Sequence, residues 1–275
     1  MTLRFTKMHG AGNDFVVVDC RTAPLALARE QIAQLGDRHL GVGFDQLLTI
    51  EPARDRASAF AYGIFNSDGS PSGQCGNGVR CVAAWLHRAG ALASGSTQLQ
   101  SPSGPIAVEL LDATHVRASM GVPRFAAAAV PLALPDADPY HLTIGAHAVE
   151  FGAVSMGNPH AVIQTGDVAS APLATLGAAL SVDPHFPQGC NVGFVQIFDP
   201  GHVRLRVWER GAGATLACGT GACAAVAVLR RRHLLDSDVA VDLPGGTLQI
   251  HWPGGEAMMT MAGPTQFVFE GEYPA

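Results

Sequence analysis

Two short segments, CGNGVRCVAA at residues 75–84 and CGTGACAA at residues 218–225, decide how this 275-residue chain is built. Each segment places a cysteine directly before a Gly-x-Gly pair and a run of small apolar residues at helical spacing. This pattern predicts a helix that begins at the glycines, so we expect helices over about 77–89 and 219–232. The same local structure is therefore expected twice.

The spacing around these segments repeats as well. Cys75 and Cys218 are 143 residues apart (218 − 75), about half of the chain. Matched polar residues precede the two cysteines: Asn13 and Asn66 in the first half, Asn158 and Glu209 in the second. The Gly-Asn pairs stand 62 residues (75 − 13) and 60 residues (218 − 158) upstream, and the second polar residue stands nine upstream in both halves. We interpret the chain as two pseudo-symmetric domains that face each other.

Apolar runs outside these segments predict mostly short strands, with one more helix over about 25–35. The expected strands lie at 3–8, 15–19, 47–51, 59–65, 97–100, 106–111, 115–120, 192–198 and 203–208. A Pro- and Ala-rich stretch, 122–139, has no clear period and predicts a crossing between domains. The expected division is a first domain, 1–120, that carries Cys75 and a second, 121–262, that carries Cys218.

Composition excludes several classes of protein. Charged residues make up 15% of the chain, and 17 Lys and Arg against a net charge of −6 leave no basic surface for nucleic acid. The triplet Arg230–Arg232 is interpreted as the cationic end of a helix. No apolar stretch reaches the roughly 20 residues that cross a bilayer, and the first residues do not resemble a signal peptide. We therefore expect a cytoplasmic protein that binds neither nucleic acid nor membrane.

A cysteine at a helix N-terminus lies beside unpaired N–H groups and the positive end of the helix dipole, which favour the thiolate. Cys75 and Cys218 are thus predicted to be reactive, and the glycines beside them leave room for a carboxylate at the same N–H groups. Racemases and epimerases remove a proton from one face of a carbon and return one to the other face. Two facing cysteines supply that geometry.

Other interpretations of the same residues are weaker. Cys20, Cys81, Cys190 and Cys223 are expected to be packing residues, since a thiol is most often buried. No Walker-type loop and no dinucleotide fingerprint accompanies the Gly-x-Gly pairs, so phosphate binding is disfavoured. Cys-x-x-Cys pairs are absent from the sequence, which argues against a zinc knuckle and a thioredoxin-like centre.

Seven motifs together resemble the diaminopimelate epimerase family over essentially the whole chain. They are MHGAGNDF (8–15), GVGFDQ (41–46), FNSDGS (65–70), QCGNG (74–78), GNPH (157–160), ERG (209–211) and ACGTGAC (217–223). The resemblance implies an α+β fold of two similar domains, each a curled, barrel-like mixed sheet around a central helix, with the active site in the cleft between them. It also implies that the terminal strand, 263–275, returns to the first domain.

The resemblance further implies an isomerase that interconverts LL- and meso-diaminopimelate, in lysine and peptidoglycan precursor synthesis, without pyridoxal phosphate, metal or other cofactor. For conversion of the LL to the meso isomer, Cys218 would be the proton acceptor and Cys75 the proton donor. His160 and Glu209 would tune the pKa values of the two cysteines. Substrate-binding roles would fall to Asn13, Gln46, Asn66, Gly76, Asn77, Asn158, Asn191, Glu209, Arg210, Gly219 and Thr220. Asn66, Asn158, Asn191 and Arg210 would recognise the distal amino-acid head.

Three positions depart from the family pattern. Gly73 and Ala214 stand where the family often has a bulkier or acidic side chain, and Phe269 stands where a tyrosine is associated with the dimer contact. A homodimer is still expected. The alternatives are a proline or hydroxyproline racemase, a phenazine-type isomerase on the same fold, and a non-enzymatic amino-acid-binding protein.

Overall fold

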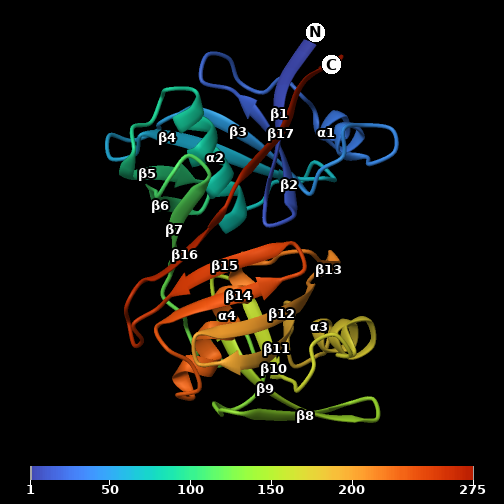
Figure 1. Ribbon diagram of the computed structural model, residues 1–275. Coiled ribbons are helices and arrows are strands. Elements are labelled where there is room, and N and C mark those ends of the chain that lie inside the picture. Colours follow the sequence, from blue (N-terminus) through green and yellow to red (C-terminus); the bar gives the residue numbers. More distant parts are fainter. Residues whose placement is uncertain (1, 275) are drawn as a thin grey trace. The chain divides into compact units, whose positions relative to one another are not determined.

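The computed structural model describes residues 2–274, and the chain folds into two compact units (Figure 1). One unit is Met1–Ser119 together with Ala262–Ala275, and the other is Met120–Met261. Among the described residues, no helix has the length and apolar character needed to cross a membrane.

The first unit is a mixed sheet whose strands pair in the order β17–β1–β2–β3–β4–β5–β6–β7. The β2–β3 and β4–β5 pairs are parallel and the others in this order are antiparallel. Its elements are β1 (Thr2–Gly10), β2 (Asn13–Asp19), α1 (Arg29–Gly36), β3 (Gln46–Pro52), β4 (Phe60–Asn66), α2 (Gly76–Arg88), β5 (Gly95–Ser101), β6 (Gly104–Leu110), β7 (His115–Gly121) and β17 (Gln266–Pro274). Although β1 and β17 come from opposite ends of the sequence, they lie side by side in Figure 1.

Helix α2 lies at the centre of the first unit, where it contacts β1, β2, β3 and β6. Val79, Val82 and Leu86 are fully buried and recur at helical spacing, so one face of the helix enters the core. That core also takes in Met8, Phe15 and other residues from the surrounding strands. The same burial fixes the start of α2 against the sheet.

The second unit has the strand order β8–β9–β10–β11–β12–β14–β15, with β13 on β12. Its elements are β8 (Tyr140–Ile144), β9 (His147–Ser155), β10 (Pro159–Gln164), the one-turn π-helix η1 (Leu173–Gly177), α3 (Ala178–Ser181), β11 (Asn191–Asp199), β12 (His202–Glu209), β13 (Gly213–Thr215), α4 (Gly219–Arg231), β14 (Asp238–Leu243) and β15 (Gly246–His251). Strand β16 (Met259–Pro264) spans the boundary between the two units. Helix α4 is buried among β9, β10, β11 and β15.

The two units share one topology. In the first unit the strand pairings run, in chain order, antiparallel (β1–β2), parallel (β2–β3) and antiparallel (β3–β4). Helix α2 follows, and then a parallel pair (β4–β5) and an antiparallel pair (β5–β6). The second unit has the same order: antiparallel (β9–β10), parallel (β10–β11), antiparallel (β11–β12), helix α4, parallel (β12–β14) and antiparallel (β14–β15). The α+β fold that the family resemblance implied is confirmed.

Two details differ from expectation. The helix expected over 25–35 begins only at Arg29, because Ala28 is extended (φ −71°, ψ 164°) and its N–H donates to Gln31 Oε1 at 2.9 Å. The stretch 122–139 contains no helix or strand, as predicted, but the hairpin β8–β9 and the short helices η1 and α3 follow it without a clear signal in the sequence.

Candidate functional site

Each cysteine of the repeat is the N-cap of its central helix. Cys75 precedes α2 with φ −145° and ψ 110°, and Cys218 precedes α4 with φ −122° and ψ 107°. The N–H of Gly78 donates to Cys75 Sγ, and the N–H of Gly221 donates to Cys218 Sγ, both at 3.3 Å. Each sulfur thus occupies the place that a serine or aspartate oxygen takes in an ordinary N-cap.

The third residue after each cap position has to be small. A Cβ on Gly78 would lie 3.2 Å from Leu48 Cδ2 and 3.5 Å from Cys75 Sγ. A Cβ on Gly221 would lie 3.0 Å from Val207 Cγ2 and 3.2 Å from Cys218 Sγ. Glycine therefore lets the helix N–H groups, the sulfur and the sheet approach closely.

Strand ends bring the polar candidates to the same edge of each sheet. In the first unit Asn13 begins β2, Gln46 begins β3 and Asn66 ends β4. Because β2 and β3 are parallel and β4 is antiparallel to them, these three positions share one edge. The corresponding positions of the second unit are Asn158, just before β10, Asn191 at the start of β11 and Glu209 at the end of β12.

The first half-site is a hydrogen-bonded cluster around Cys75. Asn13 Oδ1 accepts from Cys75 Sγ at 3.7 Å and from Asn77 Nδ2 at 3.3 Å. Gln46 Nε2 donates to Asn66 Oδ1 at 3.1 Å. Among the described residues, the buried oxygens Gln46 Oε1 and Asn77 Oδ1 have no hydrogen-bond partner. These two acceptors are open to a donor from outside the chain.

The second half-site is built around Cys218 in the same manner. Cys218 Sγ lies 3.6 Å from Thr220 Oγ1, which accepts from Asn158 Nδ2 at 3.4 Å. The other end of that amide, Asn158 Oδ1, lies 3.0 Å from His160 Nε2. The structure thus links His160 to Cys218 through Asn158 and Thr220.

Arg210 is held by its backbone beside Asn191. Asn191 Oδ1 accepts from the Arg210 N–H at 3.0 Å, and Asn191 Nδ2 donates to Pro159 O at 3.3 Å. The guanidinium donates from Nη1 to Gln188 O at 2.6 Å. A guanidinium has five N–H donors, so further donors remain for a carboxylate.

The electrostatic environment of Cys218 corrects the expectation of a thiolate. Burial, followed by the negative charge of Glu209, raises the pKa of the Cys218 thiol well above its ordinary value, and this outweighs the bonds from Thr220 and Gly221 that lower it. Glu209 Oε1 itself accepts from Thr215 Oγ1 at 2.5 Å. The helix N-terminus is favourable for a thiolate, but a sulfur on a residue that is only 4% exposed loses more from dehydration.

His160 is neutral in the folded chain. Burial, and then the positive charge of Arg210, lower the pKa of His160 to about 3. His160 is 1% exposed, and its Nε2 lies within hydrogen-bond distance of Asn158 Oδ1.

Asp45 is a polar residue of the first half-site to which the sequence assigned no role. It lies directly before β3, and its Oδ2 accepts from Asn13 Nδ2 at 2.7 Å. The motif GVGFDQ contains it, but only the fold brings residue 45 next to residue 13.

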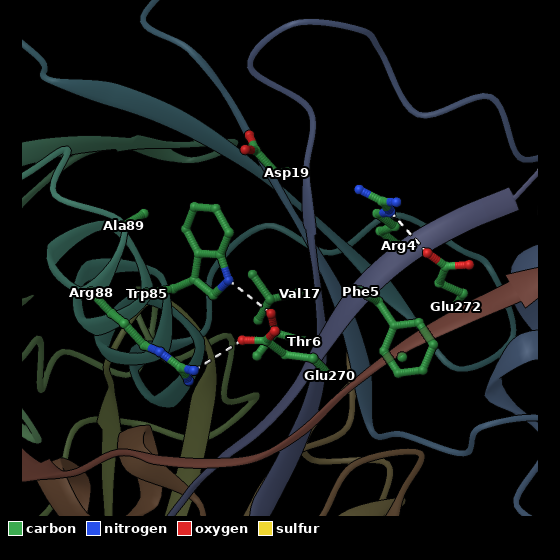
Figure 2. A pocket seen from close by; sticks show the side chains of 11 residues that line it. Arg4, Phe5, Thr6, Val17, Asp19, Trp85, Arg88, Ala89, Glu270 and Glu272 are labelled. Atoms are coloured by element: carbon green, nitrogen blue, oxygen red, sulfur yellow. Dashed lines mark hydrogen bonds and ion pairs between the residues drawn. The ribbon is translucent and has the colours of Figure 1, made fainter.

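A pocket of about 650 Å³ lies elsewhere in the first unit, and none of the predicted site residues lines it. Figure 2 shows Trp85 Nε1 donating to Thr6, and the ion pairs Arg4–Glu272 and Arg88–Glu270 at its rim. Phe269 follows nearby on β17, 48% exposed and edge-on to Phe5 with ring centroids 5.9 Å apart. Among residues 2–274, no group of three or more His, Cys, Asp or Glu side chains could hold a metal ion.

The chain is similar to known proteins over nearly its whole length. The chain matches the diaminopimelate epimerase family over residues 5–126 and 152–268. A diaminopimelate epimerase of Xanthomonas euvesicatoria pv. vesicatoria is 54% identical over 273 residues, covering 98% of this chain and 96% of that relative. The chain belongs to the diaminopimelate epimerase family.

Two other similar proteins carry the names of other racemases or epimerases. An O-ureido-serine racemase of Streptomyces lavendulae is 50% identical over 275 residues, covering 99% of this chain and 96% of that relative. The solved structure of a hydroxyproline epimerase from Agrobacterium vitis has a TM-score of 0.72 at 16% identity and covers 98% of this chain and 92% of its own. At that identity the likeness concerns the fold alone, which this chain shares with it.

Proposed function

We propose that this chain interconverts LL- and meso-diaminopimelate with two cysteines, Cys75 and Cys218, as the acid/base pair. The observation that carries the proposal is the duplication: each unit presents one thiol at the N-cap of its central helix, at equivalent places in one topology. Family membership supports the choice of substrate.

The proposed reaction needs both half-sites to act on one α-carbon. One sulfur, as thiolate, removes the α-proton, and the other, as thiol, delivers a proton to the opposite face. From LL to meso, Cys218 would be the acceptor and Cys75 the donor. The reacting carboxylate would be held by N–H groups at Gly76-Asn77 and Gly219-Thr220, which also stabilise charge in the transition state.

Glu209 is proposed to prepare Cys218 for its role. Since burial keeps Cys218 a thiol, the neighbouring carboxylate is suited to take its proton as substrate enters and the charge is needed. His160 would act through Asn158 and Thr220 rather than by contact with the sulfur.

Recognition of the second amino-acid head would fall to Asn66, Asn158, Asn191 and Arg210. The guanidinium of Arg210 suits the distal carboxylate, because its planar donors match two carboxylate oxygens. Asn13, Gln46 and Asn77 would serve the substrate near Cys75, where Gln46 Oε1 and Asn77 Oδ1 are acceptors suited to an ammonium group.

A second candidate is racemisation of O-ureido-serine, favoured by the relative at 50% identity that carries that name. The distal end of that substrate has no carboxylate, so Arg210 would have no ionic partner. Offering each substrate at equal concentration to the wild type and to Arg210→Met separates the two candidates. A loss confined to diaminopimelate supports our assignment, and faster turnover of O-ureido-serine overturns it.

The test of the mechanism is proton exchange. The reduced protein is incubated with LL-diaminopimelate in deuterated water, and α-deuterium incorporation and meso product are followed for the wild type, Cys75→Ala and Cys218→Ala. Cys20→Ala is the matched control, because Cys20 is a buried thiol away from both helix caps. We expect exchange and isomerisation in the wild type and control, and their loss in both cap variants. No exchange in the wild type would direct the search to proline-type substrates or to amino-acid binding without catalysis.

The setting of the enzyme follows from the same proposal. A cytoplasmic location without nucleic-acid or membrane partners agrees with the low content of basic residues.

A homodimer is proposed through β17, where Val268 and Phe269 are 55% and 48% exposed. Sedimentation of the wild type and Phe269→Asp tests it: a shift of the variant to the monomer mass is expected.

A further inference from the structure

The Asn13 side chain has different partners on its two sides. Its Nδ2 donates to Asp45 Oδ2 at 2.7 Å, and its Oδ1 faces Cys75 Sγ at 3.7 Å and Asn77 Nδ2 at 3.3 Å. The oxygen and nitrogen of an amide are nearly equal in size, so partners, not shape, decide which way it points. An ionised carboxylate only accepts hydrogen bonds, so the side facing Asp45 has to be the nitrogen.

The partners on the opposite side do not impose this choice. Asn77 can turn its own amide, because its Oδ1 is buried without a partner among the described residues. A thiol sulfur can donate or accept, as Cys75 does when it donates to Asn13 and accepts from the Gly78 N–H. The carboxylate is therefore the group that sets the direction of the amide.

Asp45 is itself held in place. Its Oδ2 also accepts from the Asp14 N–H at 3.0 Å, and its Oδ1 accepts from Arg38 Nη2 at 2.7 Å. Arg38 in turn pairs with Asp14 at 2.7 Å, and Asp14 pairs with Lys7 at 2.5 Å. These contacts join β1, β2 and the start of β3, so the carboxylate is presented from a braced part of the sheet.

We propose that Asp45 is a positioning residue that fixes the direction of the Asn13 amide and thereby turns its carbonyl oxygen toward Cys75. An acceptor at that place stabilises the thiol form of Cys75, whereas the NH2 group of a reversed amide would donate to the sulfur and stabilise the thiolate. Asp45 thus keeps Cys75 protonated until its proton is needed. The consequence for turnover rests on the proposed function, but the orientation of the amide does not.

The pH dependence of Cys75 alkylation reports this orientation. Peptide mass spectrometry measures iodoacetamide incorporation at Cys75 between pH 6 and 10 in the wild type and Asp45→Asn. We expect the variant to react at least about threefold faster at pH 7, with its half-maximal pH displaced downward, because thiolate is the reacting form. Two ionisable neighbours of Cys75 stay neutral in this range, because burial raises the pKa of Cys81 to about 12 and also raises the pKa of Tyr62.

A double-mutant cycle separates orientation from simple loss of charge. If Asp45 acts through the amide, Asp45→Asn has little effect on Cys75 alkylation in an Asn13→Ala background; an undiminished effect there overturns the proposal. Asp19→Asn is the matched control, because Asp19 is a similarly exposed carboxylate paired with Arg21 at the far end of β2. It should leave the alkylation profile of Cys75 unchanged.

A measurement on the wild type requires no variant to fold. Neutron diffraction locates the two amide hydrogens of Asn13 on the atom that faces Asp45 if the proposal holds, and on the atom that faces Cys75 if it is wrong. Failure of the proposed function is distinguishable from both results, since it would show as absence of α-proton exchange in the wild type while Cys75 still responds to Asp45→Asn.

Discussion

The backbone N–H of Gly221 donates to Cys218 Sγ across 3.3 Å, at the start of a helix whose dipole favours negative charge on that sulfur. Burial and Glu209 nevertheless raise the pKa of the thiol. The equivalent pair in the first unit, Gly78 and Cys75, has the same 3.3 Å distance around a sulfur that is less buried. One local motif thus supplies two sulfurs with different surroundings.

This difference predicts an order of alkylation. Cys75 should react with iodoacetamide at pH 7 ahead of Cys218, because the thiol of Cys218 is less accessible and burial raises its pKa well above the ordinary value. Glu209→Gln should accelerate the reaction of Cys218 by removing a negative charge, while burial keeps it slower than Cys75. Mass spectrometry of each cysteine peptide measures both rates. In urea, where the chain is unfolded, the two thiols should react at equal rates. Equal rates in the native protein as well would contradict the prediction.

Gly221→Ala should impair the second half-site. Its Cβ would meet Val207 at 3.0 Å and Cys218 Sγ at 3.2 Å, so the helix start has to shift away from the sulfur. We expect kcat to fall at least about tenfold and stability to fall by about 1–3 kcal/mol, as for an overpacked core. Steady-state kinetics and urea unfolding provide the measurements. Gly166→Ala is the control, since a Cβ there meets nothing within 4 Å, and a loss of the same size in both variants would refute the explanation.

The His160 imidazole should remain neutral well below pH 6.5, the ordinary pKa of a histidine. Because burial lowers its pKa to about 3 from 6.5, the folded chain binds fewer protons at this site than the unfolded chain. Its contribution to stability is therefore complete above pH 6.5 and is lost as the pH falls toward 3. NMR of the His160 imidazole should show no titration between pH 8 and 5, and a native-state midpoint near 6.5 would be inconsistent with the buried, neutral ring.

Asp14 should stabilise the first unit above mildly acidic pH. Burial opposes ionisation, but hydrogen bonds from Arg38 and Lys7 prevail and lower the pKa of Asp14 to about 2 from 3.8. The stabilisation, on the order of 2 kcal/mol, is present above pH 3.8 and is lost as the pH falls through 2.

Urea unfolding of the wild type and Asp14→Asn tests this stabilisation. The variant should be less stable at pH 7, with the difference narrowing between pH 4 and pH 2. Asp112→Asn is a useful comparison, because hydrogen bonds, first from the Thr114 N–H, rather than Lys and Arg ion pairs lower the pKa of this exposed carboxyl to about 2. A constant difference between wild type and Asp14→Asn at all pH values would show that the ion pairs do not account for the stabilisation.

The sequence alone determined the duplication, the helices that begin at Gly76 and Gly219, most strands of the first unit and the family. These features depend on local patterns: an apolar period along a helix, glycines at a helix start, and matched spacings along the chain. The hairpin β8–β9 lacked such a pattern. Helix α1 began later than its apolar period, because Ala28 is the N-cap and its N–H donates to the Gln31 side chain.

Only the tertiary structure decided the protonation and the hydrogen-bond partners of the site residues. A cysteine at a helix N-terminus is expected to ionise readily, but the sheet around α4 removes water from Cys218 and brings Glu209 beside it. In the same way, the parallel pairing of β2 and β3 brings Asp45 to Asn13, although 32 residues (45 − 13) separate them. Hydration and charge depend on neighbours that are distant in sequence, so only the folded chain determines them.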